Sequence, residues 1–313
     1  MKTISLLIPA YNEQEVLTPL YDRLTKLADD NSKYRFEFLF VNDGSRDKTL
    51  EILKQFAEKD PRIGYVNLSR NFGKETAMAA GFDHVSGDAM VIIDADLQDP
   101  PELIPEMIKH WEQGYDDVYA RRRSRDGETW LKKKTSEWYY KLLQSSTPIP
   151  IQIDTGDFRL LDRRCIDALR SFQEAQRNTK GMFSWIGFRK KEIFYDRDPR
   201  LAGDTKWNYP KLINLAIDGI TSFTTSPLRI SSVLGFLISA VAFVYILYLL
   251  VRPIFGVSTG GGYSSIMAVV LFLGGIQLLS IGIIGEYVAR IFIETKQRPL
   301  YIIEEYHGAH GKK

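Results

Sequence analysis

Two aspartates separated by one residue, Asp94 and Asp96, are well suited to bind a divalent metal ion. They follow the apolar segment AMVII, which reads as a buried strand. Mg²⁺ and Mn²⁺ take oxygen ligands, commonly one or two carboxylates with substrate phosphates and water. A metal held in this way neutralises a diphosphate leaving group as negative charge develops on it. The D-x-D spacing is common by chance, and its position after a strand gives it weight.

Two other polar segments follow apolar strands. Pro9–Glu13 follows the first strand, and Asn42–Ser45 follows the second, where the Asp43 carboxylate could accept hydrogen bonds from a ribose or a base. A dinucleotide-binding oxidoreductase would carry G-x-G-x-x-G after the first strand, and its absence disfavours that class. The alternative role for Asn12 and Glu13 is to start the next helix, and a turn with a helix cap also explains residues 42–45.

A basic cluster, Arg121–Arg123, follows the fifth predicted strand. Guanidinium groups bind phosphate through paired hydrogen bonds, so one or two of these arginines could bind the phosphate group of a substrate. Attraction to anionic lipid headgroups is the general alternative. Arg200 and Lys206 form a second candidate phosphate clamp.

The first 120 residues alternate between short apolar strands and amphipathic helices, which predicts an α/β fold with a mostly parallel, Rossmann-like sheet. Ligands of such sheets bind at the carboxyl ends of the strands, where the polar segments lie. The predicted strands are 3–8, 36–41, 64–68, 89–93 and 117–120, and the predicted helices are 13–28, 47–58, 73–82 and 101–112.

Two long uncharged segments near the C-terminus predict transmembrane helices. Ile230–Val251 and the apolar part of the second, Ile266–Ile284, each have about the 20 residues that a span requires. Buried core helices are the alternative. Basic residues follow the second segment, whereas the connecting loop carries only Arg252, so the positive-inside rule puts both termini in the cytoplasm. An apolar stripe over 209–223 predicts a helix that lies in the membrane interface or packs on the soluble domain.

The overall composition limits the classes of binding partner and the cellular compartment that we expect. The 313 residues carry 41 basic and 39 acidic side chains, a net charge of +2 that gives no general attraction to nucleic acid. A single cysteine, Cys165, forms no internal disulfide and suits a reducing compartment. The N-terminal apolar run is too short for a secretory signal.

Several motifs in order resemble those of the inverting family-2 glycosyltransferases of the GT-A fold. PAYNE, VNDGS and DADLQDPPE are similar to the general family, and DTGDFRLLDRR and GDTKW are similar to its polyprenyl-phosphate branch. That branch includes dolichol-phosphate mannose synthases and bactoprenol glucosyltransferases, and the two C-terminal spans resemble the latter. Asn42 and Thr205 differ from the residues of many relatives, which have Asp and Ser.

The resemblance implies a role for each matching residue. Asp94 and Asp96 would bind the donor diphosphate and the Mg²⁺ or Mn²⁺ ion, and Gln98 would be a further metal ligand. Asp157 would lie beside the acceptor as the catalytic base. The nucleoside would be held by residues of the first two loops, Pro9, Tyr11, Glu13 and Asp43.

We therefore expect transfer of a hexose, glucose from UDP-glucose, to undecaprenyl phosphate with inversion, on the cytoplasmic face of the inner (plasma) membrane of the cell envelope. GDP-mannose is the alternative donor, and a non-catalytic nucleotide-binding scaffold is the alternative of another class. A processive synthase would carry Q-x-x-R-W, which is absent. We expect a homo-oligomer with no nucleic-acid partner. The expected regions are a catalytic domain at 1–206, a juxtamembrane helix at 207–228 and, at 229–313, a two-span anchor with a short cytoplasmic tail.

Overall fold

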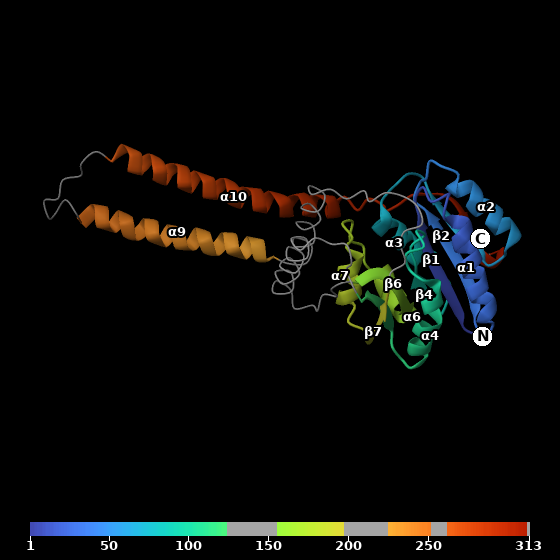
Figure 1. Ribbon diagram of the computed structural model, residues 1–313. Helices are drawn as coiled ribbons and strands as arrows, with labels where there is room; N and C mark the ends of the chain where they lie inside the picture. The colour runs from blue at the N-terminus through green and yellow to red at the C-terminus, as the bar shows by residue number, and fades with distance from the viewer. Residues whose placement is uncertain (124–154, 197–224, 252–261, 312–313) are drawn as a thin grey trace. The chain divides into compact units, whose positions relative to one another are not determined.

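The computed structural model describes residues 1–123, 155–196, 225–251 and 262–311. They fall into two compact units, one of residues 1–211 with 298–313 and one of residues 212–297. Within the described part of the first unit, one mixed sheet has the strand order β7-β5-β6-β4-β1-β2-β3-β8 (Figure 1). The strands are β1 Thr3–Ala10, β2 Arg35–Asn42, β3 Ile63–Leu68, β4 Ala89–Ile92, β5 Asp117–Arg122, β6 Thr155–Asp162, β7 Lys190–Tyr195 and β8 Ile303–His307.

The centre of the sheet is parallel, as the alternation of strands and helices predicts. β1 pairs in parallel with β2 and β4, β2 pairs in parallel with β3, and β5 pairs in parallel with β7. β6 runs antiparallel between β4 and β5, and β8 runs antiparallel to β3. The carboxyl ends of β1, β2 and β4 therefore meet at one edge of the sheet.

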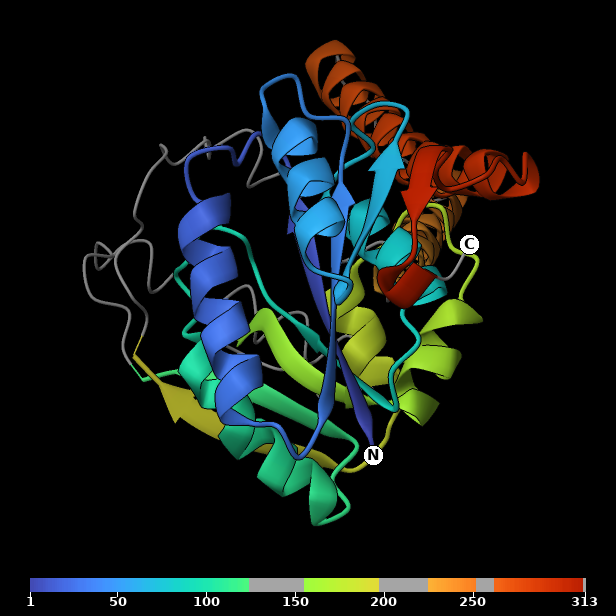
Figure 2. The same ribbon diagram turned by 90° about the vertical axis from the view of Figure 1, so that its right-hand side faces the viewer.

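Helices cover both faces of the sheet (Figures 1 and 2). Side chains alternate across a strand, so Leu6 and Ile8 of β1 enter one core while Leu7 enters the other. Three helices pack against the first core: α1 Leu17–Asp30, α2 Thr49–Lys59 and α4 Ile104–Glu112. The 3₁₀ turn η1 Pro101–Leu103 precedes α4. Three other helices pack against the second core: α3 Lys74–His84, α6 Arg163–Arg170 and α7 Thr179–Trp185.

A fully buried ion pair lies beside the second core, on the side of the sheet that α3, α6 and α7 cover. Arg159 of β6 donates to the Asp117 carboxylate of β5 at 3.1 Å, and both side chains are 0% exposed. The Arg159 guanidinium also lies 3.8 Å from the ring centroid of Phe183 in α7. Because a buried charge is stable only when it is paired, this contact fixes β6 against β5.

The five predicted strands and four predicted helices are all present, with ends that differ by up to four residues. The largest difference is at α1, which begins at Leu17 instead of Glu13 and whose N-cap is Val16, with no side-chain cap. Asn12 therefore does not cap the helix, whereas the Glu13 carbonyl accepts from the Val16 and Leu17 N–H groups in the turn that leads into α1.

The C-terminal tail joins the sheet of the first unit. β8 pairs with β3, and Tyr65 of β3 donates its hydroxyl hydrogen to Glu305 at 2.6 Å. Lys54 of α2 pairs with the same carboxylate at 2.6 Å, and the 3₁₀ turn η3 Ala309–Gly311 follows. These contacts place residues 298–313 in the first unit, whereas the sequence analysis predicted them only as a short tail after the two-span anchor.

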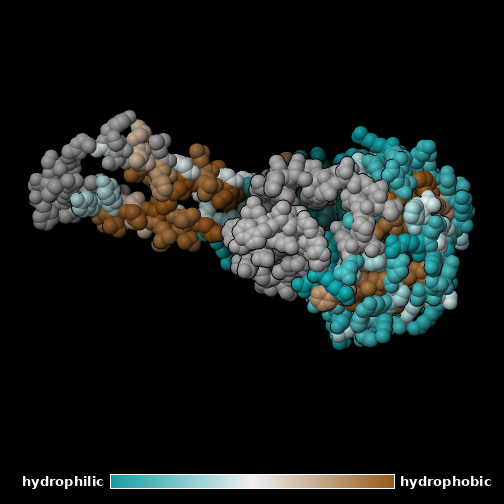
Figure 3. All heavy atoms as spheres, viewed as in Figure 1, coloured by the Kyte–Doolittle hydropathy of each residue, from teal (hydrophilic) through white to brown (hydrophobic). Residues whose placement is uncertain are grey.

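The second unit contains two apolar helices, α9 Ser226–Val251 and α10 Tyr263–Thr295. Each is long and apolar enough to cross a membrane, and hydrophobic atoms cover both (Figure 3). The Ser231 and Ser280 hydroxyls share a hydrogen bond of 2.8 Å between the two helices. Of the predicted juxtamembrane helix at 207–228, residues 207–224 lie outside the described residues.

Candidate active site

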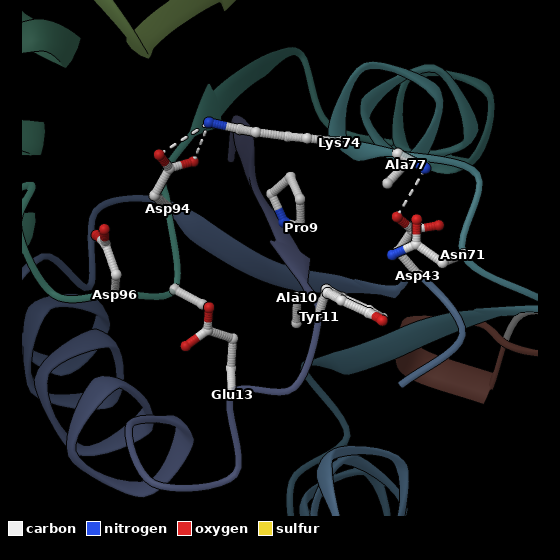
Figure 4. A pocket seen from close by; sticks show the side chains of 12 residues that line it. Pro9, Ala10, Tyr11, Glu13, Asp43, Asn71, Lys74, Ala77, Asp94 and Asp96 are labelled. Carbon is white, nitrogen blue, oxygen red and sulfur yellow. Dashed lines mark hydrogen bonds and ion pairs between the residues drawn. The ribbon is translucent and has the colours of Figure 1, made fainter. Parts of the chain in front are cut away.

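A pocket of about 260 Å³ opens at the carboxyl ends of β1, β2 and β4 (Figure 4). This is the edge at which open α/β sheets bind their ligands. All six residues predicted to bind the nucleotide sugar line it. The lining residues are Pro9, Ala10, Tyr11, Glu13, Asp43, Asn71, Gly73, Lys74, Ala77, Asp94, Ala95 and Asp96.

The loop after β1 is fixed by the loop after β2. Asn12 has a left-handed backbone, with φ of 57°, and its side-chain oxygen accepts a hydrogen bond from the Arg46 N–H at 2.8 Å. The Asn12 N–H donates to the Ser45 hydroxyl at 2.9 Å, and the Glu13 N–H donates to the Thr49 hydroxyl at 2.9 Å. These cross-links hold Tyr11 and Glu13 at the pocket wall, which gives Asn12 a positioning role.

Asp43 holds a third loop against the same pocket. Its carboxylate oxygens accept from the backbone N–H groups of Phe72 at 2.7 Å and Gly73 at 2.9 Å, and the residue is 3% exposed. Burial raises the pKa of Asp43, and the two amide hydrogen bonds oppose that rise. Asp43 therefore shapes the pocket, and a contact with the nucleoside stays a prediction.

A chain of amides extends from this loop to β8. The Asn42 side chain donates to the Asn67 side-chain oxygen at 2.7 Å, and Asn67 donates to Glu304 at 2.9 Å. Asn42 and Asn67 are buried, so their amides need these partners. The C-terminal strand thus supports the residue next to Asp43.

Asp94 and Asp96 lie on one side of the pocket (Figure 4). Leu97 has φ of 60°, and the Gln98 N–H donates to the Asp96 carboxylate at 3.2 Å, so the chain turns sharply after the second aspartate. Gln98 is not among the residues that line the pocket. Farther along this segment, Asp99 is buried and accepts from the Tyr195 hydroxyl at 2.8 Å, which anchors the turn.

The two aspartates suit a hard divalent cation. Within the described residues no group of three histidine, cysteine, aspartate or glutamate side chains could hold a metal by itself. A pair of carboxylates in an open pocket matches a metal that takes its other ligands from a diphosphate and water. The position already attracts positive charge, because an ammonium group contacts Asp94.

That ammonium belongs to Lys74, a site residue that the sequence analysis missed. Its Nζ lies 2.7 Å from one Asp94 oxygen and 2.6 Å from the Asp157 Oδ2. Lys74 is the first residue of α3, where the helix dipole disfavours a cation. This unfavourable position is the one sequence signal that could have identified it.

Asp157, the predicted catalytic residue, does not line the pocket itself but forms an ion pair with Lys74, which does. Its side chain is 9% exposed, and its Oδ1 is buried without a hydrogen-bond partner in the described part of the chain. Burial disfavours its charge, but Lys74 first and Lys180 second outweigh burial and lower the Asp157 pKa from 3.8 to about 2. Asp157 is therefore a carboxylate at every physiological pH.

A second carboxyl group lies near Asp157. Glu75 accepts hydrogen bonds from the Thr179 hydroxyl and from the Thr179 N–H, the latter at 3.0 Å. Burial, and then the negative charge of Asp157, raise the pKa of Glu75 from 4.5 to about 7. Glu75 is therefore the group beside Asp157 that titrates near neutral pH.

The predicted phosphate-binding arginines do not converge. Arg121 pairs with Glu192 at 3.2 Å, and Arg123 pairs with Asp196 at 3.3 Å. Side chains alternate along a strand, so Arg122 lies on the opposite face, where its Nε is buried without a hydrogen bond to any described residue. The three cannot bind one phosphate together. Arg200 and Lys206 lie outside the described residues.

The sequence matches one family model over about half of its length and a second at its C-terminal end. Residues 5–170 match Glycosyl transferase family 2, and residues 226–291 match the GtrB C-terminal hairpin. The chain is 48% identical over 306 residues to an uncharacterized glycosyltransferase of Synechocystis sp., covering 97% of this chain and 96% of that one. It is 43% identical over 301 residues to a prophage bactoprenol glucosyl transferase homolog of Escherichia coli, covering 96% and 98%. It is 42% identical over 301 residues to the bactoprenol glucosyl transferase of Shigella phage SfV, with the same coverage.

A solved structure shares the fold of the catalytic unit. Mannosyl-3-phosphoglycerate synthase from Rubrobacter xylanophilus aligns with a TM-score of 0.51 at 17% identity, over 69% of this chain and 71% of that chain. The family match and this solved structure both confirm the predicted α/β fold.

Proposed function

The chain belongs to glycosyl transferase family 2, and on that premise we propose that it transfers glucose from UDP-glucose to undecaprenyl phosphate. The product would be a lipid-phosphate monosaccharide with an inverted anomeric centre. Bactoprenol appears in the names of full-length relatives, and their similarity to this chain includes the C-terminal hairpin.

One observation carries the proposal: the carboxylates of Asp94 and Asp157 converge on a single ammonium group at the carboxyl edge of the sheet. The first belongs to the pair suited to a metal and a diphosphate, and the second comes from β6, a different strand. Two carboxylates from different segments repel unless a cation lies between them, so their shared contact with Lys74 at the ligand-binding edge of the sheet favours a catalytic site over a nucleotide-binding scaffold without catalytic residues.

The donor would lie in the pocket with its nucleoside between the loops after β1 and β2. Tyr11 offers a ring for contact with the base, and Glu13 offers a carboxylate for ribose hydroxyls. Asp94 and Asp96 would hold Mg²⁺ or Mn²⁺. When bound, this ion supplies Lewis-acid neutralisation of the departing diphosphate.

Asp157 would act on the acceptor side as an orienting and charge-stabilising group. A phosphate monoester loses its second proton near pH 6, so at neutral pH the attacking oxygen needs little help from a base. A carboxylate beside a phosphate dianion is unfavourable, and the Lys74 ammonium at 2.6 Å offsets that repulsion. The Asp157 charge would then stabilise positive charge that develops on the sugar.

The acceptor phosphate also needs cationic partners. Arg121, which lies on the Asp157 side of β5, could exchange Glu192 for the phosphate, and Arg200 and Lys206 stay predicted partners. Arg121 is 39% exposed, so this exchange would not require a buried ion pair to break.

The two apolar helices associate the protein with a membrane. We propose that both span the inner membrane, with the catalytic domain cytoplasmic, since basic residues follow α10. Gly274 and Gly275 of α10 have open space where a side chain would lie, which is compatible with the predicted homo-oligomer.

A donor screen tests the function. Full-length protein in detergent would be supplied with a short polyprenyl phosphate, Mg²⁺ or Mn²⁺, and radiolabelled UDP-glucose, UDP-N-acetylglucosamine or GDP-mannose. We expect label in the lipid fraction with UDP-glucose. Transfer only from GDP-mannose would replace the donor assignment, and no transfer from any nucleotide sugar would contradict the proposed activity.

A further inference from the structure

Lys74 occupies a position that a metal ion would also need. Its Nζ contacts both oxygens of Asp94, at 2.7 and 2.8 Å (Figure 4). The same Nζ donates to Asp157 at 2.6 Å. The side chain extends along the pocket wall from the start of α3 to Asp94, which follows β4 (Figure 4). The Lys74 ammonium contacts both Asp94 oxygens and therefore occupies lone pairs that would otherwise coordinate a metal ion.

A divalent ion on Asp94 would therefore compete with Lys74. Mg²⁺ coordinates oxygen at about 2.0–2.1 Å, well inside the ammonium contact distance, so the two cations cannot share the same face of one carboxylate. Their like charges also repel strongly in a half-buried site. Metal binding at Asp94 must displace the ammonium toward Asp157.

We propose that Lys74 is a positioning residue that holds Asp94 as a built-in counter-ion in the nucleotide-free enzyme, so that the divalent metal binds stably only together with the donor diphosphate. The diphosphate supplies the extra negative oxygens that the metal needs once Lys74 has moved. The displaced ammonium stays paired with Asp157 and keeps that carboxylate oriented beside the acceptor. This inference rests on the proposed metal site.

The test measures metal binding without turnover. Full-length protein in detergent would be titrated with Mn²⁺, and free Mn²⁺ would be followed by electron paramagnetic resonance with and without UDP. Lys74→Met should bind Mn²⁺ at least about tenfold more tightly than the wild type when UDP is absent, because the competing charge is gone. With UDP present the difference should shrink.

The chain offers a closely matched control. Lys54 is also 42% exposed and also makes an ion pair of 2.6 Å, but with Glu305 on β8, away from the pocket. Lys54→Met should leave Mn²⁺ affinity unchanged. Lys74→Arg keeps the charge and should retain weak binding, whereas Lys74→Gln should resemble Lys74→Met, so the conclusion does not depend on one variant.

The outcomes separate this inference from the proposed function. Equal or weaker Mn²⁺ binding by Lys74→Met in the absence of UDP, with normal binding in its presence, would overturn the counter-ion role and leave the metal site standing. Failure of the wild type to bind Mn²⁺ even with UDP would overturn both.

Discussion

Replacing Asp157 by Asn tests the assignment of the acceptor-side carboxylate most directly. The change removes one negative charge and keeps the size of the side chain. We expect turnover to fall at least about a hundredfold, the lower end of what a positioned acid or base contributes, which is about 2.7 kcal/mol. Affinity for UDP should change little, because Asp157 is not among the residues that line the nucleotide pocket.

The structure also gives the effect on stability. Lowering the Asp157 pKa from 3.8 to about 2 stabilises the folded, ionised state by roughly 2–3 kcal/mol. The folded pKa lies below the unfolded one, so this contribution is complete above pH 3.8 and is lost as the pH falls toward 2. The variant should therefore be less stable than the wild type at pH 7, and the difference should fade in acid.

The pH profile of turnover separates the possible roles of Asp157. If Asp157 orients the acceptor or stabilises charge, the deficit of Asp157→Asn should be flat from about pH 6 to about pH 9, above the phosphate pKa. A deficit that recovers markedly over this range would show that Asp157 is chiefly a base and would refute the reasoning.

A second buried aspartate serves as the control for Asp157. Asp60 is 7% exposed and pairs with Arg62 at 2.9 Å, away from the pocket. Asp60→Asn should lower stability without a comparable loss of turnover. If both variants lose turnover equally, the Asp157 effect is one of folding.

Four further results are expected. Asp96→Asn should abolish transfer, and EDTA should have the same effect on the wild type, with an unchanged circular dichroism spectrum; activity in metal-free buffer would contradict the metal role. Glu75 keeps its proton in the folded protein up to a pKa of about 7, against 4.5 when unfolded, so stability should fall by up to about 3 kcal/mol between these pH values. Glu75→Gln should flatten that decline in thermal unfolding followed in detergent. Asp117→Asn removes the buried negative charge that pairs with Arg159, and denaturant titration should show a loss of about 3–5 kcal/mol. Glu304→Ala should weaken UDP binding a few-fold in calorimetry, since one hydrogen bond of about 1 kcal/mol supports the nucleotide loop; unchanged affinity would remove β8 from the site.

The first half of the fold could be predicted because its information is local. Apolar runs of strand length, separated by amphipathic helices, identify β1 to β5, and the polar residues at their ends mark the pocket. β6 was different, because its sequence was interpreted as a motif and its antiparallel position between β4 and β5 depends on pairing between distant segments. Propensity alone does not determine such pairing.

The sequence analysis missed parts of the site for the same reason, because they depend on contacts between segments that are distant in the chain. Lys74 acts where the start of α3 meets the residues after β4 and the beginning of β6, which no linear spacing reveals. Arg121–Arg123 form one cluster in the sequence, but the alternation of side chains along β5 puts Arg122 on the other face of the sheet. Arg121 and Arg123 are each paired with a carboxylate, Glu192 and Asp196. β8 carries charged residues after an apolar helix, so it resembled a solvated tail.

The position of β8 in the chain has a consequence for biosynthesis. β3 has no partner on its outer side until the ribosome has made both apolar helices and the strand that follows them. An unpaired strand edge invites wrong association, so if both helices span the membrane as proposed, the nascent catalytic domain would remain incomplete during their insertion. Chains whose hairpin fails to insert would be poorly placed to deliver β8 to β3. Completion of the nucleotide-binding domain would thus be tied to membrane delivery, which would keep a finished enzyme from accumulating away from its lipid acceptor.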